Sequence, residues 1–231
     1  RRWTARPLSP RLGAATSRPF AVLPACTAST VPSKADLPGP HPEPPADLQD
    51  RALPLRTSAG PWMRIHWNDY EPMYFGRSPN ARFNAPDEQY GVLYVASDMH
   101  GAFIETLGHN TGLREVAIHD LAVRGPARVS TQRPLRLVNL TGPRLAQLGA
   151  DARLWTGDYR IAQRWALMFW RHRDQPDGLW YPSRHDPERF CAAIFDRAAT
   201  SINAERLGSL IDPIHTATLA NVLDTYRFAL H

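Results

Sequence analysis

The stretch YGVLYVASDMHGAFIETL, from Tyr90 to Leu107, predicts a strand that is followed at once by a helix. It begins with the apolar run Gly91–Ala96, which is rich in residues that favour strands. Asp98 then offers a side chain that can cap a helix, and apolar residues recur at helical spacing over residues 98–108. Glu105 falls on this helix between Ile104 and Leu107, near its apolar edge.

Further strands and helices are expected along the chain, but they do not alternate regularly. Expected strands are 114–123, 135–140, 179–181 and 189–195, and expected helices are 143–148, 156–173 and about 215–228. The helix at 156–173 has the strongest pattern, because Ile161, Trp165 and Phe169 recur at helical spacing. Without regular alternation of strand and helix, the sequence predicts an α+β fold rather than a doubly wound sheet.

Residues 1–60 differ in composition from the rest of the chain. They hold 11 of the 22 prolines, and they lack apolar periodicity. Proline removes a backbone donor and fixes φ, so a segment of this kind cannot easily build a core. We therefore expect a disordered leader at 1–60 and a folded domain at 61–231.

The net charge of +5 belongs mostly to this leader. Residues 1–60 carry eight basic and four acidic residues, whereas the remainder carries 19 basic and 18 acidic residues. A nearly neutral domain does not indicate a nucleic-acid surface. No apolar run approaches 18 residues, so no membrane partner is expected. The two isolated cysteines, Cys26 and Cys191, suit a reducing cytoplasm.

Several common catalytic motifs are missing from the sequence. No G-x-G occurs, which excludes the dinucleotide-binding fingerprint, and there is no H-E-x-x-H or paired C-x-x-C. His100, His109 and His119 show no metal-ligand spacing, so no metal is expected. Ser183, His185 and Asp186 fall within four consecutive positions. A catalytic triad needs side chains that converge from separate elements, so these three are not expected to form one.

Five motifs occur together in one order. They are RIH (64–66), FGRSPNARFNAP (75–86), YGVLYVA (90–96), AFIET (102–106) and DGLWYPSRH (177–185). Each is weak alone, but the combination resembles the RES domain family, which is named for an Arg, a Glu and a Ser. The resemblance covers roughly residues 61–200.

The resemblance implies an ADP-ribosyltransferase-like fold, with mixed or antiparallel sheets and flanking helices. It also implies that the domain at 61–231 is a catalytic domain that cleaves NAD+. Members of the family are commonly bacterial toxins that deplete NAD+ in the cytoplasm, and each is typically paired with an antitoxin protein that blocks the pocket. The oligomeric state and the acceptor of ADP-ribose (water, phosphate or protein) stay open.

Matching positions assign roles to six residues. Arg64, Glu105 and Ser183 correspond to the Arg, Glu and Ser of the family and would be catalytic. Arg64 would also bind NAD+, together with the three residues at the remaining matched positions, Arg82, Asn84 and Tyr94.

These residue types suit the chemistry of NAD+. The nicotinamide leaves as a neutral pyridine and needs no proton, so a single carboxylate such as Glu105 is enough to stabilise the ribose cation. Arg64 and Arg82 offer planar donors for the pyrophosphate. Tyr94 offers an aromatic face to the cationic ring, and Ser183 offers a hydrogen bond to a ribose or an amide. This scheme requires no metal.

Two other functions fit the same residues. One is an ADP-ribosyltransferase that modifies a protein target, in which case only the acceptor differs. A non-catalytic interaction module that retains the fold is the alternative outside enzymes, and it is suggested by the family's pairing with inhibitors.

Overall fold

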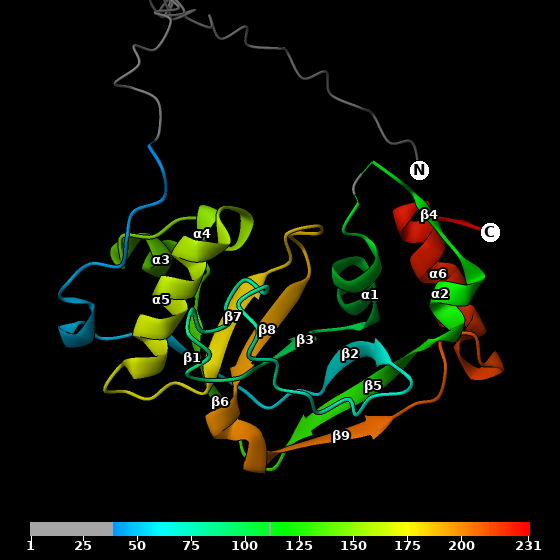
Figure 1. Ribbon diagram of the computed structural model, residues 1–231, viewed down its shortest axis with the longest axis horizontal. Helices are drawn as coiled ribbons and strands as arrows, with labels where there is room; N and C mark the ends of the chain where they lie inside the picture. Colours follow the sequence, from blue (N-terminus) through cyan, green and yellow to red (C-terminus); the bar gives the residue numbers. More distant parts are fainter. Residues whose placement is uncertain (1–38, 111) are drawn as a thin grey trace, which may run out of the picture. The chain divides into compact units, whose positions relative to one another are not determined.

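A single large sheet organises the folded part of the protein. The computed structural model describes residues 39–110 and 112–231, and the folded unit runs from Pro40 to His231. Eight strands lie in the order β1-β6-β7-β8-β3-β2-β5-β9 (Figure 1). Their bounds are β1 Leu55–Ser58, β2 Trp62–Trp67, β3 Val92–Ala96, β5 Arg124–Thr131, β6 Leu135–Asn139, β7 Gly178–Pro182, β8 Phe190–Phe195 and β9 Ile202–Arg206.

The sheet is mixed, because β6 and β7 are parallel and the other neighbouring strands are antiparallel. A separate pair of short strands, β4 (Glu115–Val116) and β10 (Ala229–Leu230), is also parallel. The predicted α+β class with flanking helices is therefore confirmed.

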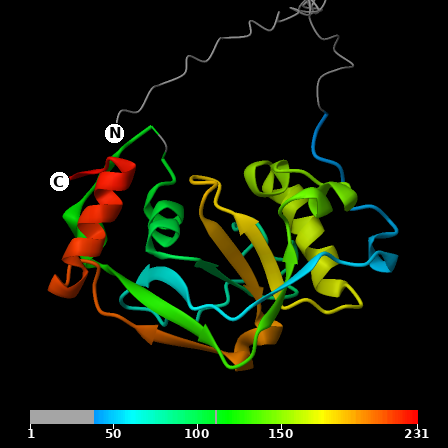
Figure 2. The same ribbon diagram turned by 180° about the vertical axis from the view of Figure 1, so that it is seen from behind.

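Helices gather beside the two halves of the sheet, as both ribbon views show (Figures 1 and 2). One group lies near β2, β5 and β9, and consists of α1 Met99–Leu107, α2 Ile118–Ala122 and α6 Thr216–Tyr226. The other group lies near β1, β6 and β7, and consists of α3 Pro143–Gln147, α4 Arg153–Thr156 and α5 Tyr159–Arg171. Short 3-10 turns complete the fold at Leu48–Asp50, Asp196–Ser201 and Pro213–His215. No helix in the described ranges is long and apolar enough to cross a membrane.

The strand β3 is buried on both faces, which explains its continuous apolar sequence. Val92 and Ala96 belong to the larger core, with Phe103 of α1 and Trp165 of α5. Leu93 and Val95 point the other way, into a second core that also contains Trp62 and Trp180. The predicted strand and helix at 90–108 are confirmed, since Asp98 Oδ1 accepts a hydrogen bond of 2.8 Å from Gly101 N at the start of α1.

The predicted leader is wrong for residues 40–60, because this segment is part of the folded unit. Its first part packs on α5, where Trp165 Nε1 donates to Pro42 O and Gln49 Nε2 donates to Met168 O, both at 2.9 Å. Leu48 is fully buried, and β1 pairs with β6. The prolines did not prevent this, because side-chain hydrogen bonds in both directions hold the segment on α5, and these need no apolar periodicity in the segment. Residues 1–38 of the predicted leader lie outside the described residues.

The predicted strand at 114–123 is also wrong. Residues 115–116 form β4, and residues 118–122 form the helix α2. The apolar residues of this run predict one buried strand, but their burial differs. Ile118 is 56% exposed, while Val116 and Leu121 are buried. The strands β2, β5 and β9 were not predicted. The strand β5 contains Gly125 and Pro126, and both residue types are unusual inside a strand.

Asp177 joins β6 to the turn before β7. Its carboxylate accepts two hydrogen bonds from the Arg133 guanidinium, at 2.7 and 2.8 Å, and one of 2.8 Å from Arg136 N. Burial by itself would raise the pKa of Asp177, but these hydrogen bonds hold the pKa below its ordinary value. A carboxyl whose pKa is lowered on folding stabilises the fold above its unfolded pKa, and this contribution is lost as the pH falls.

Replacement of this carboxylate should weaken the fold in a pH-dependent way. We expect Asp177→Asn to lower the free energy of unfolding by about 1–3 kcal/mol at pH 7, because a buried charge-assisted bond is lost. Urea unfolding followed by circular dichroism should show this difference shrinking below about pH 4. The exposed Asp69→Asn is the control, and an equal difference at pH 3 and pH 7 would contradict the assignment.

Candidate functional site

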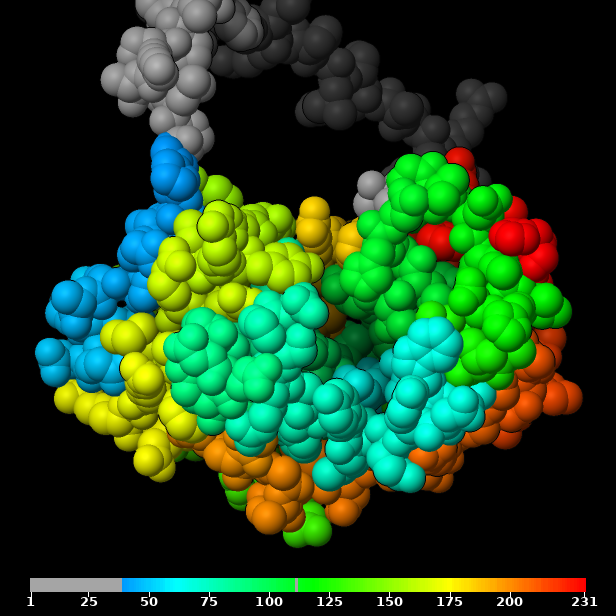
Figure 3. All heavy atoms as spheres, in the orientation of Figure 1, coloured from blue at the N-terminus to red at the C-terminus, as the bar shows by residue number. Residues whose placement is uncertain are grey.

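A cavity of about 440 Å³ opens over β2 and β3, between α1 and the segment that joins α4 to α5. Figure 3 shows the surface hollowed between these two groups of helices. Four of the six predicted site residues line the cavity: Arg64, Arg82, Tyr94 and Glu105. These residues come from β2, the loop before β3, β3 itself and α1, so the fold brings distant parts of the sequence together.

Glu105 projects from α1 and is held on one side of its carboxylate. Its Oε1 accepts a hydrogen bond of 2.5 Å from Ser183 Oγ and one of 2.9 Å from Arg184 N. Among the described residues, no hydrogen-bond partner is found for Oε2. One oxygen is therefore fixed by the protein, and the other is available to a ligand in the cavity.

Ser183 lies behind Glu105 and is buried, so it does not line the cavity. Its hydroxyl donates to Glu105 and accepts from the backbone N–H groups of His185 and Asp186, both at 3.1 Å. The hydroxyl therefore bonds to backbone rather than to an imidazole. This geometry suits orientation of the carboxylate and not nucleophilic attack by serine.

Arg64 places a largely buried guanidinium in the wall of the cavity. Its Nη1 donates to Tyr94 O at 2.7 Å, while its buried Nε has no hydrogen-bond partner in the structure. Burial lowers the pKa of Arg64 to about 10, so the group remains charged at neutral pH. A buried cation of this kind is stabilised by a negatively charged ligand.

Arg82 is a second buried guanidinium on the same cavity, with only 8% of its surface exposed. Its Nη1 donates to Gly157 O at 2.7 Å, and its guanidinium lies 4.3 Å from the centre of the Tyr159 ring. Burial also lowers the pKa of Arg82. Within the described part of the chain, neither Arg82 nor Arg64 forms an ion pair with a carboxylate.

Tyr94 fixes the loop that carries Arg82. Its hydroxyl accepts from Phe83 N at 2.8 Å and donates to Asn84 Oδ1 at 3.0 Å, and burial raises the pKa of this phenol. Asn84 in turn donates to Gly76 O and Ser78 O. Because its amide is used in this way and is buried, Asn84 lies behind the cavity wall and supports Tyr94 rather than lining the cavity.

Sequence reasoning did not find several residues of the cavity wall. Trp155 and Tyr159 come from α4 and α5, and no motif marks them. His109 and His185 also line the cavity, with ring centres 5.7 Å apart, and burial lowers the pKa of His185. The position of His185 beside Ser183 was the available signal.

The comparisons with known proteins agree with the motif order. A model of the RES domain matches residues 54–215. The chain belongs to the RES domain family. The family match starts at the beginning of β1, which agrees with a fold that includes this strand.

One sequence relative and one structural neighbour of this RES protein are informative. The "Probable toxin y4kH" of Sinorhizobium fredii (strain NBRC 101917 / NGR234) is 29% identical over 117 residues, which cover 50% of this chain and 89% of that protein. A chain in the crystal structure of the M. tuberculosis MbcT-MbcA toxin-antitoxin complex aligns with a TM-score of 0.54 and 12% identity. That alignment covers 74% of this chain and 92% of the other, and it shows a shared fold.

Removal of the Tyr94 hydroxyl should loosen the loop before β3. We expect Tyr94→Phe to lower the free energy of unfolding by about 1–3 kcal/mol, because it leaves the buried Phe83 N–H without an acceptor. Chemical unfolding measures this loss. The control is Tyr70→Phe, since Tyr70 is 67% exposed. Equal stability of the two variants would show that the hydrogen bonds of Tyr94 contribute nothing.

Proposed function

We propose that this protein is an enzyme that cleaves NAD+ at the bond between nicotinamide and ribose, and that it acts as a toxin. One observation carries the proposal. Two largely buried guanidinium groups, Arg64 and Arg82, have no carboxylate partner in the described part of the chain and share a cavity with the half-free carboxylate of Glu105. A substrate that combines anionic phosphates with a ribose cation in the transition state suits this set of charges.

The parts of NAD+ correspond to separate parts of the cavity wall. Arg64 and Arg82 supply planar donors for the pyrophosphate, and their burial strengthens each interaction because little water competes. Tyr94 lines the cavity while its hydroxyl is engaged elsewhere, so its ring would offer an aromatic surface to the cationic nicotinamide. A volume of about 440 Å³ is in the range of small-molecule sites.

Glu105 would stabilise the transition state. When the glycosidic C–N bond breaks, its electron pair goes to the pyridinium nitrogen, and neutral nicotinamide leaves without a proton. The ribose carbon becomes electron-poor, and Glu105 Oε2 offsets the positive charge or holds a ribose hydroxyl. Ser183 and Arg184 N fix Oε1 in advance, so little reorganisation is needed. A fixed charge of this kind is commonly worth about 3 kcal/mol of barrier.

The toxin part of the proposal draws on the relatives. One relative is named a probable toxin, and the structural neighbour comes from a toxin-antitoxin complex. We extend both properties to this chain, with action on the NAD+ of the bacterial cytoplasm and an antitoxin protein as partner. The open mouth of the cavity gives such a partner a surface to cover.

Nicotinamide release tests the reaction. We expect the purified protein to release nicotinamide from NAD+, and Glu105→Gln to reduce kcat by at least about 100-fold, since the only carboxylate on the described cavity wall is lost. Glu205→Gln, at an exposed position on β9, is the matched control and should keep full activity. The folded state of each variant is checked by circular dichroism.

The products of the same reaction show whether water, phosphate or a protein accepts the ADP-ribose. Hydrolysis gives free ADP-ribose, phosphorolysis gives phosphorylated ADP-ribose only when phosphate is added, and transfer gives a protein of greater mass in a treated lysate. Growth arrest on expression, relieved by Glu105→Gln, would support a toxic enzyme. Growth arrest that survives Glu105→Gln, without nicotinamide release, would favour the non-catalytic interaction module instead.

A conservative change at Arg82 should separate binding from chemistry. The variant Arg82→Lys keeps the positive charge but loses the planar guanidinium and its stacking on the Tyr159 ring. We expect KM for NAD+ to rise about 10-fold, with a change in kcat of less than about 3-fold, because phosphate contacts hold the ground state and the transition state alike. Steady-state kinetics measure both, with the exposed Arg160→Lys as control. An unchanged KM would remove Arg82 from the phosphate site.

A further inference from the structure

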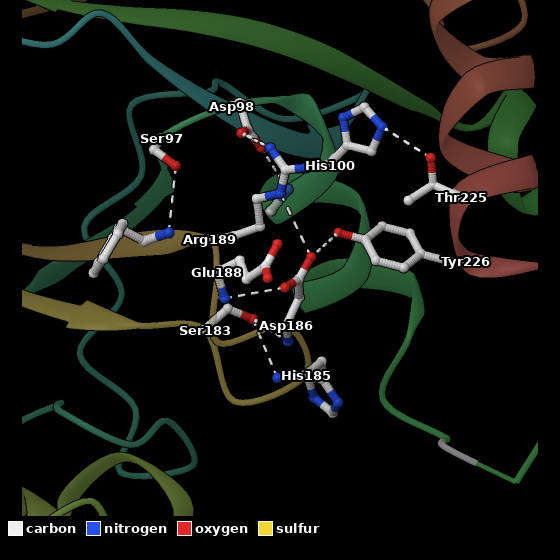
Figure 4. Close-up of polar contacts among 12 residues, drawn as sticks. Ser97, Asp98, His100, Ser183, His185, Asp186, Glu188, Arg189, Thr225 and Tyr226 are labelled. Carbon is white, nitrogen blue, oxygen red and sulfur yellow. Dashed lines mark hydrogen bonds and ion pairs between the residues drawn. The ribbon is translucent and has the colours of Figure 1, made fainter. Parts of the chain in front are cut away.

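The loop between β7 and β8, residues 183–189, holds Glu105 and is itself held from two sides (Figure 4). Ser183 Oγ and Arg184 N are the two groups that bond to Glu105 Oε1. Both positions depend on the shape of this loop. Whatever fixes the loop therefore also fixes the carboxylate.

Asp186 lies at the centre of the loop. Its backbone N–H donates to Ser183 Oγ at 3.1 Å, and its carbonyl accepts from Arg189 N at 2.9 Å. Its carboxylate Oδ2 accepts a hydrogen bond of 2.7 Å from the hydroxyl of Tyr226. A chain of contacts thus runs from Tyr226 through Asp186 and Ser183 to Glu105.

Arg189 closes the loop against α1. Its Nη1 donates to Asp98 Oδ2 at 2.7 Å, and its Nε lies 3.5 Å from Asp186 Oδ2. Asp98 also caps α1 through Gly101 N. Figure 4 shows Arg189 between the two aspartates, with Tyr226 approaching Asp186 from the other side. The loop is therefore joined both to the helix that carries Glu105 and to the C-terminal helix.

Tyr226 is the last residue of α6, and α6 lies beyond residues 54–215, where the family model matches. Its hydroxyl bonds to Asp186 and to no other group in the described chain, and its ring contacts the edge of His100 on α1, with centres 6.0 Å apart. Partial burial and the bond to Asp186 raise the pKa of Tyr226, so it stays a hydrogen-bond donor at neutral pH.

We propose that Tyr226 is a positioning residue for the reaction, which orients Glu105 through Asp186 and Ser183. The inference rests on the proposed function, and it adds a contribution from a helix outside the family match. A small displacement of a catalytic group lowers the rate strongly, while ground-state binding through Arg64 and Arg82 is not affected. The effect should therefore fall on kcat.

The test removes one hydroxyl. Tyr226→Phe should reduce kcat for nicotinamide release about 10-fold and change KM for NAD+ less than 2-fold. The control Tyr70→Phe removes the hydroxyl of an exposed tyrosine and should match the unaltered protein. A variant with unchanged kcat, or with a loss confined to KM, would overturn the proposal.

A double-mutant cycle separates positioning from simple stabilisation of α6. If Tyr226 acts through Ser183, Tyr226→Phe should change kcat less than 2-fold in a Ser183→Ala background. Independent, multiplying losses would contradict the proposal. Asp186→Asn is a second variant that weakens the same contact from the loop, and it should reproduce the kcat loss if Tyr226→Phe does not fold.

Amide hydrogen exchange keeps the inference distinct from the proposed function. In Tyr226→Phe, exchange should become faster at residues 184–186, and the protection of α5 should stay unchanged. This measurement needs no turnover. If the unaltered protein releases no nicotinamide, only the proposed reaction is rejected. If Tyr226→Phe leaves amide exchange at 184–186 unchanged, the coupling between Tyr226 and the loop is rejected.

Discussion

The site depends on one hydrogen bond, the 2.5 Å contact from Ser183 Oγ to Glu105 Oε1. It joins the end of β7 to α1, two elements that are 78 residues apart in sequence. Because the serine hydroxyl donates its single proton to the carboxylate, it can only accept from the backbone N–H groups of the following loop. The backbone N–H groups of the loop can only donate, so the serine proton is left for Glu105.

The two buried arginines impose the opposite constraint, because they destabilise the protein without a ligand. Arg64 and Arg82 bond to backbone carbonyls, which satisfy donors but do not neutralise charge. The surrounding core supplies the stability that tolerates them, through Phe103, Trp165 and the strands beneath. An anionic ligand of the kind proposed above would offset both charges at once.

The sequence predicted the parts of the fold whose information is local. The strand and helix around Asp98 carry their own apolar period and their own cap, so their bounds were predicted closely. Residues 40–60 could not be predicted, because their order comes from hydrogen bonds with α5, which is more than a hundred residues away: Gln49 Nε2 donates to Met168 O, and Trp165 Nε1 donates to Pro42 O. The strand β5 was missed because its contacts with β2 and β9, and not its composition, make it a strand.

The candidate site divides in the same way. Motif order identified four of the residues that line the cavity, Arg64, Arg82, Tyr94 and Glu105, but it assigned Asn84 and Ser183 to ligand contacts, whereas the structure places both behind the wall. Which residue touches a ligand and which supports it is decided by burial and by hydrogen-bond partners. Tyr226 had no sequence signal at all, because its partner Asp186 lies 40 residues earlier in the chain.

The order of strands in the sheet also has a consequence for the time course of folding. The strand β3 pairs with β8, and Val92 faces Phe195 across more than a hundred intervening residues. A sheet built from such distant pairs folds slowly, typically in milliseconds to seconds for small domains. The cavity wall includes Arg184, His185 and Cys191, so it stays incomplete in each newly made molecule until residues 183–195 have docked.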